Sequence, residues 1–474
     1  MGSIQGRVTT FIGCIINYAA RSGLCLAVLA VITLLAAPHR AEAIPAFAKK
    51  YNAPCGLCHT TWPRLNAEGY KFKLNAYQLP DSRDGQETGK ISPSFDLHLD
   101  TGKANPPVSL RLFGGLGVFG PRSGPDGAQA NVFPCCNNSN LMDLYAAGTI
   151  DKDIGYFASY QMGKTDIDQG YLRIANIFGP GYFGIDLGGI RTADSDAVSP
   201  NREWFGSANP AFFGNSNLRG GDIGLPLGYT DTGLRIFGNP DYGPFTYDVE
   251  MVSGARRVGQ GVSTRGSAYS VMARMDIGGF AGSFRYWDNR SGELVFQPTA
   301  SGSYTYSLGQ TAGAGEFAPD RMSPDEKTQD YLFAMNYRAD RWELEAVYDM
   351  NNFAIGQRTN GADSYTQSQM KRTGLAVAWI YRLSPFVNFG TRYGTSTVKD
   401  YNQTVTVNGT TNTYLFSPAT ASQLDVKFEF LPTQNSRISL LWTLDNSNAE
   451  ARMNGAGTVY DLQSKLFLLW DWAI

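Results

Sequence analysis

Residues 424–430 run Leu424-Asp425-Val426-Lys427-Phe428-Glu429-Phe430, a strict alternation of apolar and charged side chains. A period of two places successive side chains on opposite faces of a β-strand. Residues 342–349 and 245–251 repeat the pattern, so that aromatic and aliphatic side chains alternate with acidic ones. These stretches predict strands with one apolar and one charged face.

Alternating strands of this kind are also found in soluble β-sandwiches, which turn the apolar face inward. Three features favour a transmembrane antiparallel β-barrel instead. The segments are about ten residues long, the length that a tilted strand needs to cross a membrane. Short turns alternate with long polar loops, as periplasmic turns alternate with extracellular loops in outer-membrane barrels. The chain also ends within an alternating segment, residues 465–474.

The connections allow the strands to be counted. The largest loops are expected near Thr192–Pro226 and Asn289–Asp325. Counting from Val108 to Ile474 gives about 16 strands, an even number that keeps both chain ends on the periplasmic side. Short turns are predicted at Asp151–Asp153, Gly179–Gly181, Asn239–Tyr242, Ile277–Gly279, Ala339–Asp340, Ser384–Pro385 and Pro432–Gln434.

Composition agrees with this fold class and excludes others. The chain has 474 residues and 53 glycines, with 17% charged residues and a formal net charge of −2. A charge this small, without a basic patch, argues against nucleic acid as a partner.

The N-terminus is predicted to direct export. Arg7 and Arg21 precede an apolar run at residues 24–37, and Ala41-Glu42-Ala43 forms a small-x-small cleavage site. We therefore expect residues 1–43 to be a signal peptide and the mature chain to begin near Ile44. An uncleaved anchor is the alternative, but the run is short for a membrane-spanning helix.

The segment after the signal contains Cys55-Gly56-Leu57-Cys58-His59, the spacing of a c-type haem attachment site. Cys55 and Cys58 are expected to form thioether bonds to one haem c, and His59 is expected to ligate its iron. A zinc site would need more nearby Cys or His ligands, and a redox disulfide would need a βαβ surround. Residues 44–100 are therefore predicted to be a small cytochrome segment with a linker, and residues 101–474 the barrel.

A helix is expected to begin at Pro63, because an apolar face recurs at three- and four-residue steps through Leu65, Gly69, Phe72 and Ala76. This face is expected to cover the haem, and Gly69 to allow close approach of the backbone. The second iron ligand stays open. His98 is the one other histidine after the predicted cleavage site, and a methionine of the barrel, Lys71, Lys73 or water are alternatives.

Two further groups of residues have more than one interpretation. Cys135 and Cys136 are adjacent in the first long loop, where a vicinal disulfide or surface thiols fit better than a metal site. Six arginines are predicted to point into the lumen. They either line an ordinary porin interior or hold the haem segment as a plug, and they are Arg111, Arg173, Arg235, Arg285, Arg372 and Arg392.

The N-terminal region resembles the fused monohaem cytochrome–porins of the outer membrane of iron-oxidising bacteria. The similarity covers about thirty residues, while over the barrel it is architectural only. Its specific part is an Ala-x-Pro-x-Phe-Ala start, the haem motif and a Pro-x-Leu…Gly…Phe-Lys stretch, here Ala43, Pro45, Phe47, Ala48, Cys55, Cys58, His59, Pro63, Leu65, Gly69, Phe72 and Lys73.

The resemblance implies an oxidoreductase of the outer membrane that takes electrons from extracellular Fe(II) and passes them to periplasmic c-type cytochromes. The haem would lie at the periplasmic side of the barrel or within its lumen. Other interpretations are the same conduit serving manganese or a mineral, a solute porin plugged by its haem segment, and a scaffold or adhesin.

Overall fold

The computed structural model describes most of the barrel and part of the N-terminal segment. The described residues are 47, 51, 54–60, 64–79, 108–119, 131–135, 142–151, 153–161, 167–199, 204–205, 230–252, 266–291, 304–305, 311–312, 327–360, 363–399, 401–407, 410–416, 418–433, 436–445, 450–451, 458–459 and 463–473. The predicted signal peptide and most of the predicted linker lie outside them.

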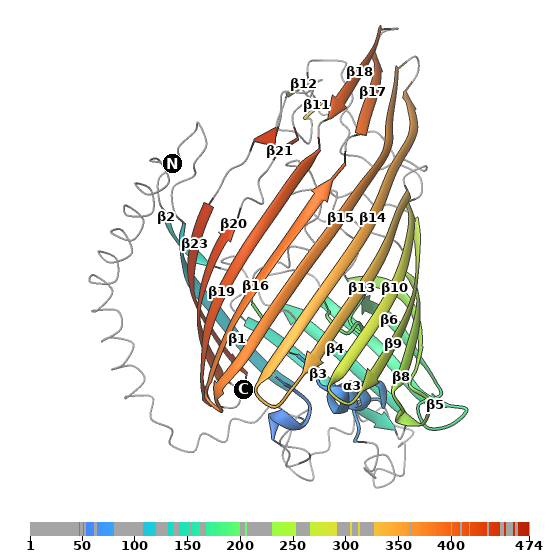
Figure 1. Ribbon diagram of the computed structural model, residues 1–474. Coiled ribbons are helices and arrows are strands. Elements are labelled where there is room, and N and C mark those ends of the chain that lie inside the picture. Colours follow the sequence, from blue (N-terminus) through green and yellow to red (C-terminus); the bar gives the residue numbers. More distant parts are fainter. Residues whose placement is uncertain are drawn as a thin grey trace, which may run out of the picture.

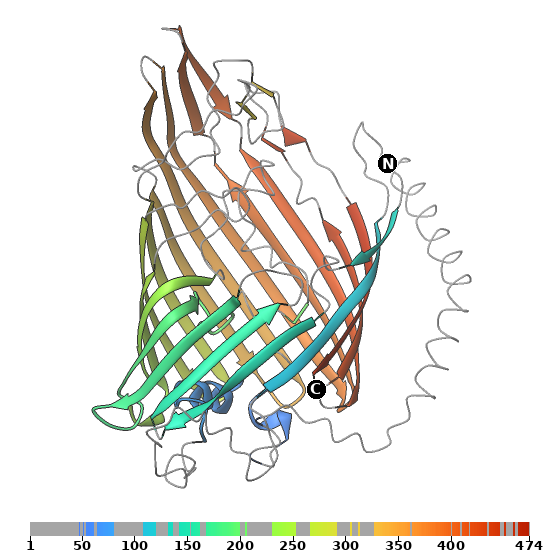
Figure 2. The same cartoon turned by 180° about the vertical axis from the view of Figure 1, so that it is seen from behind.

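Within the described residues, 16 strands pair antiparallel in chain order and close into a barrel (Figures 1 and 2). The last strand returns to the first, with Arg111 opposite Ala473 and Phe119 opposite Lys465. The strands are β1 Val108–Phe119, β3 Met142–Asp151, β4 Ile154–Gln161, β5 Ile167–Ile177, β6 Phe183–Arg191, β7 Thr230–Gly238, β8 Phe245–Val252, β9 Gly266–Ile277, β10 Phe280–Ser291, β13 Lys327–Arg338, β14 Trp342–Asn360, β15 Asp363–Ser384, β16 Val387–Val398, β19 Ala419–Thr433, β20 Ser436–Asp445 and β23 Gln463–Ala473.

Shorter elements extend the wall or lie beyond it. β2 (Asn131–Cys135) pairs with the C-terminal half of β1, Gly115–Phe119, so Cys135 lies in a strand rather than in an open loop. The hairpin of β17 (Tyr401–Val407) and β18 (Thr410–Phe416) pairs with the far end of β15. Two small pairs are β11 (Tyr304–Thr305) with β12 (Thr311–Ala312), and β21 (Glu450–Ala451) with β22 (Thr458–Val459).

The described connections confirm the predicted turns. Short links join β3 to β4, β5 to β6, β7 to β8, β9 to β10, β13 to β14, β15 to β16 and β19 to β20. The link after β7 contains the 3-10 helix η4 (Pro240–Tyr242). All these links lie at one end of the barrel, which we assign as periplasmic because short turns lie there in outer-membrane barrels.

Burial along the strands is the reverse of that in a soluble protein. Asp425 is 0% exposed and Lys427 1%, whereas Phe428 between Lys427 and Glu429 is 46% exposed. The same inversion holds on β14, where Glu343 and Glu345 are buried and Leu344 is exposed. An outward apolar face and a charged interior are stable only when lipid surrounds the wall. The chain is therefore a transmembrane β-barrel, as the sequence predicts.

The six arginines expected in the lumen do point inward. Five are fully buried, and Arg111 is partly buried, its side chain hydrogen-bonded to Asp471. Within the part of the chain that the structure describes, no helix is long and apolar enough to cross a membrane.

Val271 at the middle of β9 faces outward and is 51% exposed. We predict that Val271→Arg destabilises the barrel by about 2–4 kcal/mol, because a guanidinium near the bilayer centre loses its hydration. Equilibrium unfolding from lipid vesicles measures the change. The control Thr413→Arg, in the exposed β17–β18 hairpin, should have little effect. Equal tolerance of both substitutions would contradict the assignment of the outer face to lipid.

Candidate functional site

The Cys55–His59 motif forms a tight turn that doubles back on the following residues. Cys55–Leu57 is a 3-10 helix, η1, closed by a hydrogen bond from the Leu57 amide to the Pro54 carbonyl (2.9 Å). His59 then pairs with Leu65 in an isolated antiparallel bridge. The motif residues Cys55, Cys58 and His59 are thereby held within one short loop.

The imidazole of His59 is oriented by the backbone. Its Nδ1 lies 3.2 Å from the Arg64 carbonyl oxygen, so a hydrogen bond there places the proton on Nδ1. Nε2 then carries the lone pair, which is the form in which histidine binds a metal. This orientation of His59 is the one expected of an axial haem ligand, and in this respect the residue fits the group.

Asn66 ties the motif to the helix behind it. Its Nδ2 donates hydrogen bonds to the carbonyls of Leu57 (2.9 Å) and Gly56 (3.3 Å). Its Oδ1 accepts from the Gly69 amide (2.9 Å), as the N-cap of helix α3 (Ala67–Leu74). One side chain therefore fixes the register of the motif against the helix.

The start of this helix corrects the sequence prediction. Pro63 does not begin it, because Leu65 is extended in the bridge to His59 and the cap is Asn66. The close approach at Gly69 is to the motif itself: a Cβ at this position would overlap the Cys58 carbonyl oxygen. Whether the helix also covers the porphyrin stays a prediction.

An aromatic cluster lies beside Cys58. Phe72 and Tyr77 of the segment pack with Tyr171 of β5, and Phe47, Tyr51 and the half-buried Cys58 lie against them. The rings of Phe47 and Tyr77 stack at 5.6 Å. Burial and the neighbouring Tyr171 raise the pKa of Tyr77 well above its ordinary value, so this hydroxyl stays protonated. The cluster gives a flat apolar ring such as a porphyrin a suitable surface.

The segment carrying the motif is fastened inside the periplasmic end of the barrel (Figures 1 and 2). Lys73 of α3 forms a buried ion pair with Asp194, and Arg173 of β5 donates to the Lys73 carbonyl. The Arg274 guanidinium stacks 3.8 Å above the Tyr70 ring. Arg382 donates to the carbonyl of Thr60, directly after His59 (3.0 Å). We call residues 54–79 the plug.

A second segment fills the lumen above the plug. Residues 192–199 and 204–205, which follow β6 and which we call the inward loop, are buried. Asp196 pairs with Arg285 of β10 (2.7 Å), and its carbonyl accepts from the Tyr70 hydroxyl (3.1 Å). Trp204 donates to Glu429 on the opposite wall (2.8 Å). The inward loop therefore links the plug to both sides of the barrel.

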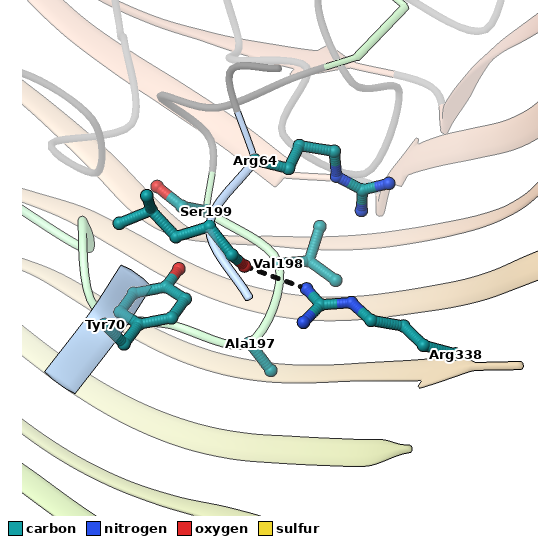
Figure 3. Close-up of a pocket in the computed structure, with 7 residues that line it drawn as sticks. Arg64, Tyr70, Ala197, Val198, Ser199 and Arg338 are labelled. Carbon is teal, nitrogen blue, oxygen red and sulfur yellow. Dashed lines mark hydrogen bonds between the residues drawn. The ribbon is translucent and has the colours of Figure 1, made fainter. Parts of the chain in front are cut away.

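Two small spaces lie where the described plug meets the wall. One, of about 10 Å³, is lined by plug and inward-loop residues together with Arg338, whose hydrogen bond to the Leu65 carbonyl (3.1 Å) is drawn in Figure 3. The other, of about 30 Å³, lies beside Thr60 and is lined by three arginines and two carboxylates, namely Arg338, Arg341, Arg382, Asp340 and Glu343. Both border the loop that carries His59, and in the second Arg338 is paired with Glu343 (2.9 Å).

Some of the site residues predicted from the sequence are described by the structure, and others lie outside the described residues. Cys55, Cys58 and His59 share one short turn of the backbone, and their role as haem ligands stays a prediction. Of the alternative ligands, Lys71 pairs with Glu68 (3.1 Å) and Lys73 with Asp194. His98 and Cys136, and the side chain of Cys135, lie outside the described residues. Sequence reasoning missed Asn66, although an Asn directly before a helix is a recognisable cap signal. It also missed Asp194 and Asp196, because nothing local marks a loop that turns inward.

Comparison with models of known protein families gives no match, and no curated protein matches the chain. Among solved structures, the chain is similar to OmpT of Vibrio cholerae, with 10% identity over 77% of this chain and 97% of that one and a TM-score of 0.49. An anion-selective porin of Comamonas acidovorans is 8% identical, covers 77% and 98% of the two chains, and has a TM-score of 0.47. The channel DcaP of Acinetobacter baumannii is 12% identical over 77% of this chain and 96% of that one, with a TM-score of 0.46.

Asn66→Ala removes the helix cap and both bonds to the motif carbonyls, whereas Asn66→Asp keeps an acceptor for the cap and loses the two donated bonds. We predict faster hydrogen exchange at the Gly69 amide in Asn66→Ala, corresponding to about 1–2 kcal/mol of local stability. Asn66→Asp should restore protection at Gly69 but not haem incorporation. Full haem incorporation in both variants would show that Asn66 does not position the motif.

Burial raises the pKa of Asp196 from 3.8 to about 6, although Arg285 opposes the shift. Because the folded pKa is the higher one, the folded protein binds more protons than the unfolded chain between these values. The stability from this group is complete below about pH 4 and is lost as the pH rises through 6. We predict that the protection factor of the Ala197 amide, which donates to Ser283 (2.9 Å), falls over this range in the native protein and stays constant in Asp196→Asn. The protection factor divides the intrinsic, base-catalysed exchange rate by the observed rate at the same pH. A constant protection factor in the native protein would contradict the shift.

Proposed function

We propose that this protein carries single electrons across the outer membrane, taking them from extracellular Fe(II) and passing them to a periplasmic c-type cytochrome. One haem c would be bound covalently by Cys55 and Cys58, with His59 as an axial ligand. The observation that carries the proposal is the haem motif, oriented by Arg64 and Asn66, inside the periplasmic end of a closed barrel.

The chemistry asks little of the protein beyond placement. Haem supplies reversible one-electron exchange, so no general acid, base or nucleophile is required from the chain. What the residues supply is a fixed imidazole and an aromatic surface beside Cys58. Arg341 and Arg382 line the space next to Thr60, where guanidinium groups would suit the haem propionates, whereas Arg338 beside them is paired with Glu343.

Oxidation of Fe(II) outside the cell explains why an electron, rather than the metal, would cross the outer membrane. Fe(III) is insoluble at neutral pH, so oxidation inside the cell would deposit solid around the enzyme. A barrel whose lumen holds a plug and an inward loop favours transfer of charge over passage of solutes. The resemblance of the N-terminal segment to the cytochrome–porins of iron oxidisers supports Fe(II) as the donor, while manganese and minerals are alternatives for the same conduit.

A second candidate function is a solute porin, favoured by the charged lumen wall itself. In that case the plug would regulate or partly obstruct diffusion. Liposome swelling with small sugars distinguishes the two, because a conduit with a filled lumen should show almost no uptake. Rapid swelling with the native chain would favour the porin.

The decisive experiment is absorbance spectroscopy of the purified protein during anaerobic addition of Fe(II). We predict one haem per chain. Its reduction by Fe(II) should shift the Soret band to longer wavelength and make a sharp α band appear. Loss of the iron ligand in His59→Ala should change the oxidised spectrum and abolish this reduction. His98→Ala tests the second ligand, since a changed spectrum would assign His98 and an unchanged one would exclude it. A native chain without covalent haem would overturn the proposal.

A further inference from the structure

Two acidic side chains face each other diagonally across β13 and β14 in the lumen. Asp330 lies opposite Asn351, and Asp349 lies opposite Leu332. Arg372 of β15 lies opposite Asn351 on the other side. Asp330, Asp349, Asn351 and Arg372 are at most 2% exposed and share the inward face. We call Asp330 and Asp349 the lumen carboxylate pair.

The hydrogen bonds of this group are incomplete. Among the described residues, neither carboxylate oxygen of Asp330 has a hydrogen-bond partner of ordinary geometry, and the same holds for Oδ1 of Asp349 and Nδ2 of Asn351. Arg372 bonds to the other oxygen of Asp349 and to Ser396 (3.3 Å). Asp330 is therefore a fully buried carboxylate whose described partners are the Asn351 side chain opposite it and the Arg372 guanidinium.

Other carboxylates of the described lumen form direct ion pairs, although one arginine can serve several of them, as Arg285 serves Asp196, Asp248 and Glu250. Asp425 accepts two hydrogen bonds from Arg392 (2.6 and 2.9 Å). Glu250 is paired with both Arg235 (2.8 Å) and Arg285 (3.0 Å). Among the described residues, the two acids of the lumen carboxylate pair share the guanidinium of Arg372, which leaves one negative charge when both are ionised. A buried charge of that kind requires a proton or a bound cation.

The pair occupies a defined height in the barrel. Level with Asp349 and in the next inward-facing row toward the periplasm, Leu332, Val347 and Ala376 pack with Ala197 and Val198 of the inward loop and with Trp287. β13 and β15 run toward the periplasmic turns, so Asp330 and Arg372 lie on the extracellular side of this apolar contact. A cation arriving from outside would meet the carboxylates before it met the apolar contact.

We propose that Asp330 and Asp349, with the amide oxygen of Asn351, bind an oxygen-preferring divalent cation of the Fe²⁺ or Mn²⁺ class. Carboxylate and amide oxygens suit such ions, and water completes their coordination. The amide oxygen and nitrogen are interchangeable by rotation of the side chain, so Asn351 can turn its oxygen to the metal. Binding does not depend on the proposed function; the further idea that the bound cation is the electron donor rests on it.

The test uses the purified full-length protein and Mn²⁺, which haem does not oxidise, with electron paramagnetic resonance counting the free ion. We expect one bound Mn²⁺ per chain and an affinity lower by roughly tenfold or more in Asp330→Asn. Asp340→Asn, at an exposed periplasmic turn, is the matched control and should bind as the native chain does. Equal binding by native protein and Asp330→Asn would overturn the site.

A second variant keeps the test informative if Asp330→Asn fails to fold. Asn351→Asp adds a third carboxylate and should tighten Mn²⁺ binding, whereas unchanged weak binding would show that Asp330 is neutralised by a proton. Mn²⁺ binding without haem reduction by Fe(II) would refute the proposed function and leave the site standing. Haem reduction by Fe(II) in a chain that binds no Mn²⁺ would refute the cation site and leave the proposed function standing.

Discussion

The constraint on which the structure depends is the closure of the sheet by β1 and β23. In hydrocarbon, every backbone N–H and C=O must find a partner within the protein, and an open edge cannot exist there. Pairing Arg111–Phe119 with Lys465–Ala473 removes both edges at once. Closure also creates an interior, and that interior decides where the charged residues go and where a plug can be held.

The interior is an ion-paired network rather than a water-filled tube over much of its described height. Asp186 bonds to Arg173 and Arg235, and Arg235 bonds in turn to Glu250. Removing one partner of a buried pair leaves the other charge uncompensated, which is costly. This interdependence keeps the walls, the inward loop and the plug in one arrangement.

The plug is too small to form a core of its own and uses the barrel as its core. Tyr70, Lys73 and Tyr77 contact strands or the inward loop, and Phe72 packs both with aromatic rings of its own segment and with Tyr171 of β5. Placement of His59 therefore depends on the barrel as well as on Asn66. A segment of this length would be poorly ordered by itself.

The sequence by itself determined the barrel, its turns and the inward arginines, because a period of two assigns each side chain to a face and short turns have local signals. It also determined the grouping of Cys55, Cys58 and His59, which are neighbours along the chain. Only the tertiary structure decided that the helix begins after Asn66, that residues 192–199 turn into the lumen, and that Asp194 and Asp196 meet the plug and Arg285. Those contacts join residues about 90 to 120 positions apart, and no local pattern encodes which charged side chains will meet once the sheet has closed.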